Sequence, residues 1–524
     1  MRLALRRDRI VLAVSVAALA AMTVAGAASI AELYPSARSR ASFAASVGAN
    51  PGLAALIGPP FDLTTVGGIT AWRLGGTVAV LAALIGLFTV VRHTRAEEEA
   101  GRLELLGAGV VGRHAPLTAA LLVAWGGGLA LAVAVAAGLI GLVELPTEGS
   151  IALAVALGSV CWTFAAIAAV AAQLSESART ARGIAAAALG ASYVARAAGD
   201  SAGEGGLLWL SWLSPIGWAQ RVRPFADERW WVLGVSTAVV LVLVAIAYRL
   251  VSRRDLGAGL LPARLGAARA GTGLASALGL AWRLQRAALL GWTVGFALTG
   301  ASLGLVAQGV GDLLDDNAQL RSFLAERGGA QGIVDAYLAS SVGFVGILAA
   351  AYAVQATLRL RSEERELRAE PILATGVDRA RWTLSHFVFA VVGSAIPLAA
   401  AGLGAGLVHG LRTGDVTAQV PRLLVAALVQ LPAAWVLAGI ALALFGLVPR
   451  WASASWALLA AFLVLAQLGQ VLGLDERILD LSPFAHVPKL PGGELHAAPL
   501  VALTAVAAAL VGAGLVGFRR RDVS

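Results

Sequence analysis

The stretch Arg95-Ala-Glu-Glu-Glu-Ala-Gly-Arg-Leu-Glu104 returns 266 residues later as Arg361-Ser-Glu-Glu-Arg-Glu-Leu-Arg-Ala-Glu370. Two shorter motifs recur at nearly the same offset: Leu213-Ser214-Pro215 as Leu481-Ser482-Pro483, and Arg253-Arg254-Asp255 as Arg520-Arg521-Asp522. A fixed long period is the mark of a repeated structural unit. The repeats therefore predict that the chain is a tandem duplication.

The composition predicts what surrounds these repeats. Of 524 residues, 58% are hydrophobic and only 14% are charged, whereas an average soluble domain carries about 25% charged residues. The excess apolar surface is expected to face lipid, which makes this an all-α polytopic membrane protein. The net charge of +9 then reflects loop arginines that set topology and not a nucleic-acid partner. One cysteine and six scattered histidines exclude a disulfide framework and offer no metal site.

Hydrophobic runs long enough to cross a bilayer, about 20 residues each, occur twelve times. The predicted spans are 10–30, 74–92, 116–142, 151–173, 183–199, 231–250, 287–308, 340–358, 382–408, 423–447, 453–473 and 497–518. The fifth is short and carries Arg196 near its end. The first could also be a cleaved secretory signal, but its apolar run is longer than such signals need, which favours an uncleaved helix.

The loop charges predict the orientation. With the N-terminus inside, 27 of the 40 basic residues fall on the inner face, as the positive-inside rule requires, and both termini are cytoplasmic. Because six is even, two six-helix units share one orientation and form parallel repeats. The predicted organisation is a first six-helix repeat (1–255), a Gly/Ala-rich cytoplasmic linker (256–282) and a second six-helix repeat (283–524).

Two kinds of energy source can be tested against the sequence. The spans contain no Asp or Glu in their apolar cores, which weighs against a proton-coupled transporter. A P-loop needs Gly-x-x-x-x-Gly-Lys-Ser/Thr, yet Lys489 is the only lysine and Leu490 follows it. The chain is therefore expected to be no enzyme itself, and an ATP-driven process would need a separate ATPase.

Such an ATPase would dock on the cytoplasmic side, and the repeated charged segments 93–115 and 359–381 are the best candidates. Membrane topology depends on positively charged loop residues, so it does not explain why acidic residues recur at matching positions of the two segments. Their recurrence favours a docking role. The alternative is a solvated juxtamembrane helix whose charges fix orientation. The predicted ATPase-coupling residues are Glu97, Glu98, Arg102, Glu104, Arg113, Glu363, Glu364, Arg368, Glu370 and Arg379.

At these residues the chain resembles a known family. Glu98-Glu-Ala-Gly-Arg-Leu-Glu-Leu-Leu-Gly-Ala-Gly-Val-Val-Gly-Arg113 is similar to the coupling-helix region of ABC type-2 permeases. Gly58-Pro-Pro-Phe-Asp-Leu-Thr-Thr-Val-Gly-Gly-Ile-Thr-Ala-Trp-Arg73 and Trp212-Leu-Ser-Pro-Ile-Gly-Trp-Ala-Gln-Arg-Val-Arg-Pro-Phe225 resemble the twelve-span actinobacterial exporters of polyketide antibiotics, the tetronasin-resistance type. The likeness covers essentially the whole chain, but its motifs specify no substrate.

The resemblance implies the membrane-spanning half of an ABC exporter in a bacterial plasma membrane. Two copies of a separately encoded ATPase would bind ATP and Mg²⁺, so this chain would need no cofactor of its own. ATP-driven closure would rock two six-helix bundles and expel hydrophobic compounds such as antibiotics or other drugs. The substrate-binding residues are not identified by this likeness.

The second repeat departs from the family pattern. Pro371 follows Glu370 where an apolar residue is expected, and Thr375-Gly376 stand where Gly109-Val110 stand in the first repeat. Proline bends or restarts a helix. We therefore expect the two segments to bind the ATPase unequally.

Two other classes of protein fit the sequence less well. A twelve-span secondary transporter of the major-facilitator layout would carry Gly-x-x-x-Asp-Arg-x-Gly-Arg-Arg between spans two and three, which the sequence Gly101-Arg-Leu-Glu-Leu-Leu-Gly-Ala-Gly-Val-Val-Gly-Arg-His114 does not match. A membrane-embedded enzyme acting on lipids would need paired carboxylates or histidines near the interface. Asp62, Asp227 and Asp475 are isolated loop residues, which more often form turns.

Overall fold

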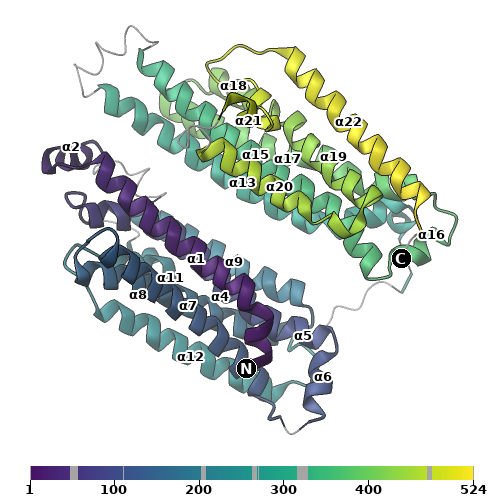
Figure 1. The fold of residues 1–524 in the computed structure, drawn as a ribbon, viewed down its shortest axis with the longest axis horizontal. Helices are drawn as coiled ribbons and strands as arrows, with labels where there is room; N and C mark the ends of the chain where they lie inside the picture. Colours follow the sequence, from purple (N-terminus) through teal and green to yellow (C-terminus); the bar gives the residue numbers. More distant parts are fainter. Residues whose placement is uncertain are drawn as a thin grey trace. The chain divides into compact units, whose positions relative to one another are not determined.

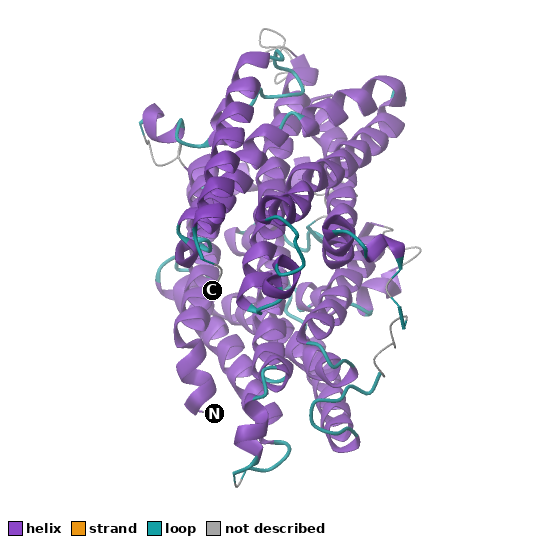
Figure 2. Cartoon of the chain, turned by 90° about the vertical axis from the view of Figure 1, so that its right-hand side faces the viewer, coloured by secondary structure: helices purple, strands orange, loops and turns teal. Residues whose placement is uncertain are grey.

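The structure is a computed structural model that describes residues 2–47, 57–109, 111–201, 208–261, 268, 269, 271–315, 329–468 and 475–522. Within these ranges the chain is helical and contains no strand (Figure 2). It divides into two compact units, Met1–Leu265 and Gly266–Ser524. The boundary lies inside the predicted linker 256–282, although the first long helix of the second unit begins earlier than the predicted repeat, at Ala277.

The first unit contains the purple-to-teal helices of Figure 1. They are α1 (Arg2–Leu33), α2 (Ala37–Val47), α4 (Val66–His93), α5 (Arg95–Glu99), α6 (Arg102–Gly107), α7 (Ala115–Gly141), α8 (Thr147–Leu174), α9 (Ala178–Ser201), α10 (Leu208–Trp212), α11 (Pro215–Arg221) and α12 (Trp231–Arg253). Helix α8 is the most buried, because α4, α7, α9 and α12 all pack against it.

The second unit contains the teal-to-yellow helices. They are η2 (Thr272–Leu274), α13 (Ala277–Asp315), α15 (Gly329–Arg365), α16 (Ala369–Leu373), α17 (Arg379–Thr413), α18 (Val416–Leu428), α19 (Leu431–Leu447), η3 (Pro449–Trp451), α20 (Ala454–Leu468), α21 (Glu476–Leu479), η4 (Pro483–His486) and α22 (Ala497–Arg520). Its helices contact one another in the same order as those of the first unit: α13 on α17, α15 on α19, and α22 on α19.

Small residues let these apolar helices approach closely, as is common where lipid replaces water as the solvent. A Cβ added at Gly86 of α4 would collide with the carbonyl oxygen of Cys161 on α8. In the second unit a Cβ at Gly446 of α19 would collide with the carbonyl oxygen of Gly514 on α22. Backbone contact at these two crossings therefore depends on glycine.

The prediction of a polytopic helical membrane protein is confirmed, because ten helices of the described residues are long and apolar enough to span a bilayer. Two of the twelve predicted spans are not among them. Helix α9, over the predicted span 183–199, carries Arg179, Arg182, Arg196 and Asp200. Helix α20, over 453–473, has 15 described residues, and positions 469–474 lie outside the described part of the chain.

The predicted span 423–447 is interrupted in the structure. Helix α18 ends at Leu428 and α19 begins at Leu431. Pro432 lies in the first turn of α19, where its missing N–H is tolerated, while in an uninterrupted helix it would remove a backbone hydrogen bond. The corresponding helix of the first unit, α8, is continuous over 28 residues.

The Leu-Ser-Pro repeats begin short helices in both units. Ser214 is the N-cap of α11, and its side chain accepts a hydrogen bond from the Gly217 N–H at 3.1 Å. Ser482 is the N-cap of η4. In each case the proline occupies the first helical position, for which its fixed φ is suited. Trp209, Trp230 and Trp231 beside α11 are exposed while Trp218 is buried, a distribution typical of an interfacial aromatic belt.

Candidate functional site

The repeated charged segments lie at one end of each unit. In the first unit α5 and α6 lie at the end that holds the N-terminus, and in the second unit α16 lies at the end that holds the C-terminus (Figure 1). We call this the charged end of each unit. In the first unit the charged end brings together the segment after α4 and the last residues of α12. In the second unit it brings together the segment after α15 and the last residues of α22.

A left-handed residue turns the chain at the same position of both segments. In the first unit it is Gly101 with φ +70°, directly before α6. In the second unit it is Leu367, 266 positions later, with φ +56°. Leu367 N–H bonds to the Glu364 carbonyl and Arg368 N–H to the Glu363 carbonyl, both at 2.9 Å, which is the Schellman pattern at a helix C-terminus. The turn ends the long helix and begins the short one.

Replacing Gly101 with alanine is expected to lower the apparent melting temperature of the purified chain by about 2 °C. No heavy atom lies near its Cβ position, so the penalty is the left-handed backbone alone, about 1 kcal/mol. Gly112→Ala is the matched control, because Gly112 is equally open and is not left-handed. Leu367→Gly should raise the melting temperature. Equal shifts for Gly101 and Gly112 would contradict the assignment.

Glu98 and Glu364, two predicted coupling residues, are buried in bidentate ion pairs. Glu98 accepts hydrogen bonds from Arg254 Nη1 at 2.6 Å and Nη2 at 2.9 Å. Glu364 accepts them from Arg521 Nη1 at 2.6 Å and Nη2 at 2.8 Å. The glutamate side chains are 3% and 4% exposed. These two carboxylates therefore face inward, toward the last helix of their own unit.

Glu97 and Glu363 form a second matched pair of contacts. Glu97 accepts hydrogen bonds from Arg102 Nε at 2.6 Å and Nη2 at 3.1 Å, and Glu363 accepts them from Arg368 at 2.8 and 3.1 Å. These carboxylates raise the pKa of Arg102 and of Arg368 above the usual guanidinium value. Both bridges span the left-handed turn and thereby fix the angle between the long and the short helix.

Arg113 and Arg379 attach the following helices to the same end. Arg113 donates to the carbonyl of Arg254. Arg379 Nη1 donates to the carbonyl of Arg521 at 2.5 Å and of Phe518 at 3.2 Å. Cations at a helix C-terminus offset its unpaired carbonyls. Each unit thus joins three elements at its charged end.

Glu104 and Glu370 differ from the other eight predicted residues. Both side chains are exposed, at the first turn of α6 and of α16, and neither forms an ion pair within the described ranges. Pro371 lies in the first turn of α16, which has five residues against six in α6. These two glutamates are available to a partner.

Sequence reasoning did not assign Arg254 and Arg521 to the site. Their motif Arg253-Arg254-Asp255 was visible as a repeat of Arg520-Arg521-Asp522, but it was used only as evidence for the duplication. The sequence did offer a clue: Glu98 and Glu364 are separated by nearly the same number of residues, about 266, as Arg254 and Arg521.

The first unit adds a contact that the second lacks among its described residues. Linker residues 256–261 lie against the C-terminus of α8, where the Leu260 N–H donates to the Gln173 carbonyl at 3.1 Å and the Leu261 N–H to the Leu174 carbonyl at 2.9 Å. Fully buried Arg95 lies beneath them and donates to the carbonyls of Ala172 and Ala258, each at 3.0 Å. The linker therefore reinforces the first charged segment.

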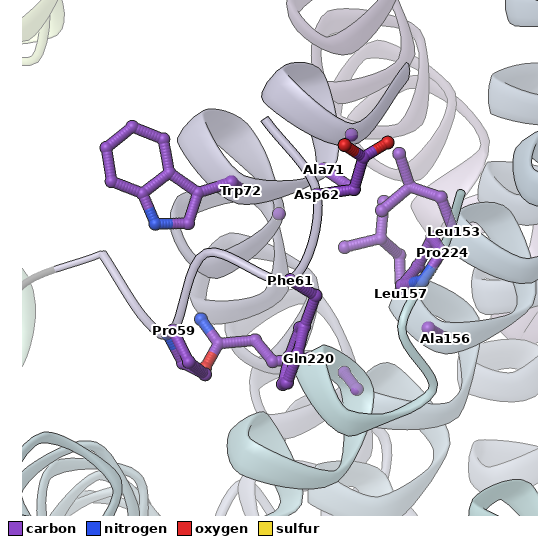
Figure 3. Close-up of a pocket in the computed structure, with 13 residues that line it drawn as sticks. Pro59, Phe61, Asp62, Ala71, Trp72, Leu153, Ala156, Leu157, Gln220 and Pro224 are labelled. Carbon is purple, nitrogen blue, oxygen red and sulfur yellow. The ribbon is translucent and has the colours of Figure 1, made fainter. Parts of the chain in front are cut away.

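At the opposite end of the first unit, the two family-like loop motifs meet. Trp72 Nε1 donates to the Gly58 carbonyl at 2.8 Å and Gln220 Nε2 to the Ile57 carbonyl at 2.6 Å. Asp62 and Phe61 lie beside Trp72 and Gln220 around a small cavity (Figure 3). Its volume of about 30 Å³ holds roughly one water molecule. These motifs build the loop structure and offer no room for a drug.

A larger cavity of about 340 Å³ lies between α1 and α4. Leu12, Leu19, Leu84 and Phe88 line its apolar part. Asp8, at one margin, pairs with Arg92 at 2.7 Å. The volume lies within the range of small-molecule sites, about 300–1,000 Å³.

Comparison with known proteins gives two matches. Residues 274–519 match the family described as multidrug efflux system permease Rv1217c, C-terminal domain. The whole chain is 45% identical over 524 residues to the multidrug efflux system permease protein Rv1217c of Mycobacterium tuberculosis (strain ATCC 25618 / H37Rv), covering 100% of this chain and 94% of that protein.

Proposed function

Because the chain belongs to the family of multidrug efflux system permeases that includes Rv1217c, we propose that it is the transmembrane subunit of an ATP-driven ABC exporter. It is a multi-pass protein of the plasma membrane and a drug-efflux permease. The proposal adds the energy source, the partner and the architecture: two parallel six-helix repeats, with α9 and α20 as the fifth and eleventh of twelve spans.

The observation that carries this proposal is the pair of charged segments in matched geometry. Each is a short helix attached rigidly to its own unit, with one acidic side chain left exposed: Glu104 on α6 and Glu370 on α16. Two such elements fit two copies of one ATPase. Since the sequence contains no P-loop lysine, ATP and Mg²⁺ would be bound on those copies and hydrolysed there.

The proposed substrates are hydrophobic compounds, including antibiotics and, as the finer possibility, polyketides. The apolar cavity between α1 and α4 supports an apolar substrate class. In this mechanism ATP-driven closure of the ATPase pair displaces the charged ends. The displacement changes which side of the membrane the transport path faces.

Purification of the tagged chain from its native membrane in mild detergent tests the proposal. We expect a P-loop ATPase to co-purify at about two copies per chain, with vanadate-sensitive hydrolysis stimulated by apolar drugs. As a control, the same membranes carrying an untagged chain should give no ATPase in the eluate.

A secondary transporter is the competing function. It predicts a chain that purifies alone, hydrolyses no ATP, and exports drugs only while a proton gradient is present. That combination, under conditions that preserve known ABC complexes, would overturn the proposal.

A further inference from the structure

We propose that Glu98–Arg254 and Glu364–Arg521 are positioning pairs that transmit displacement of each charged segment to the last helix of its own repeat. The inference rests on the proposed function, because it states how a force applied at the charged end would enter the membrane part. It assigns these glutamates a role inside the permease, distinct from contact with the ATPase.

The first argument is geometric. Each pair joins residues far apart in sequence, 156 and 157 positions, and does so through two parallel hydrogen bonds. A bidentate guanidinium–carboxylate contact fixes orientation as well as distance. The C-terminus of α12 or α22 cannot slide past the charged segment without breaking both bonds.

The second argument is burial. Arg254 and Arg521 are 10% and 16% exposed at the side chain, and the two glutamates are less exposed still. Removing one partner of a buried pair leaves an uncompensated charge, which is strongly unfavourable. The pair is therefore a stiff connection, unlike an exposed ion pair, whose contribution is small.

The third argument is the difference between the units. The first segment is also held by the linker through the Gly257 N–H, which donates to Glu98 at 2.7 Å. In the second unit, within the described residues, Glu364 accepts side-chain hydrogen bonds from Arg521 alone. Both units contain the Glu–Arg pair. In the second unit the pair has fewer additional contacts, so its contribution can be measured there most directly.

Two further features favour a connection over a docking surface. Each glutamate already accepts a hydrogen bond on both carboxylate oxygens from its arginine. At 3% and 4% exposure, neither side chain offers a surface for an ATPase to contact. The exposed Glu104 and Glu370 require no such rearrangement.

The test uses the second unit in the intact complex of permease and ATPase. Glu364→Ala, Arg521→Ala, the graded variants Glu364→Gln and Arg521→Lys, and the exchange Glu364→Arg with Arg521→Glu are compared with wild type. The control is Glu494→Gln, because Glu494 is 89% exposed and precedes α22 at the end of the second unit opposite the charged end. Membrane level, co-purified ATPase, drug-stimulated hydrolysis and drug efflux are measured for each.

We expect the single variants to retain the ATPase but to lose drug stimulation and efflux by about tenfold, a typical coupling between sites. The exchange should restore most of both, and Glu494→Gln should match wild type. Where an alanine variant fails to reach the membrane, Arg521→Lys decides, because it keeps the charge and loses the bidentate contact.

Three results would overturn the inference: efflux unchanged in every single variant, an exchange that restores nothing, or loss of the ATPase itself, which would make the pair part of the docking surface. Failure of the proposed function is distinguishable, because then the wild-type chain would show no ATPase and no ATP-dependent efflux.

Discussion

Reversing the charge of both exposed glutamates, Glu104→Arg with Glu370→Arg, is expected to weaken binding of the ATPase about 100-fold. Each reversal replaces an attraction by a repulsion, on the order of 1.4 kcal/mol or more at a partly exposed contact, and each 1.4 kcal/mol is tenfold. Efflux should fall with the loss of the partner. The fold should survive, because neither side chain forms an ion pair within the described residues.

The measurement is the amount of ATPase retained on the tagged permease over a range of salt concentrations. Glu494→Arg is the control, since Glu494 is 89% exposed and precedes α22 at the end opposite the charged end. If the double reversal binds as much ATPase as Glu494→Arg does, the short helices α6 and α16 are not the docking elements. The single reversals should differ from each other if Pro371 changes how α16 is presented.

Much of the fold could be predicted because it depends on composition and length. Apolar runs of about 20 residues leave a helix little alternative in a bilayer. Helix α9 shows what this reasoning does not reach. Its buried Asp200 bonds to Arg221 at 3.0 Å and pairs with Arg196 at 3.7 Å, and tertiary partners of this kind cannot be read from hydrophobicity.

The candidate site was partly predictable for a related reason. The duplicated register identified the charged segments, because both copies keep the same residue types at the same spacing. Helical spacing shows which residues share a face but not which face is buried. The inward direction of Glu98 depends on Arg254, 156 positions away. The second copy of that pair was the only available signal.

Arg95 and Arg361 occupy the same position of the repeat but lie in different surroundings. The Arg95 side chain is fully buried, and it donates to the Ala172 and Ala258 carbonyls and pairs with Glu98 at 3.1 Å. Arg361 is half-buried and makes no hydrogen bond of its side chain within the described part of its unit. The difference arises from linker residues 256–261, which lie over Arg95.

Arg95→Ala is therefore expected to destabilise the chain by about 3 kcal/mol or more, since it leaves buried carbonyls unsatisfied and removes one partner of Glu98. The apparent melting temperature should fall by roughly 5–10 °C, while Arg361→Ala should stay within about 2 °C of wild type. Arg95→Lys should be intermediate, because an ammonium cannot reproduce the guanidinium fork. Equal shifts for Arg95→Ala and Arg361→Ala would show that the linker does not stabilise the first charged segment, and the two segments would then have to be treated as mechanically equivalent.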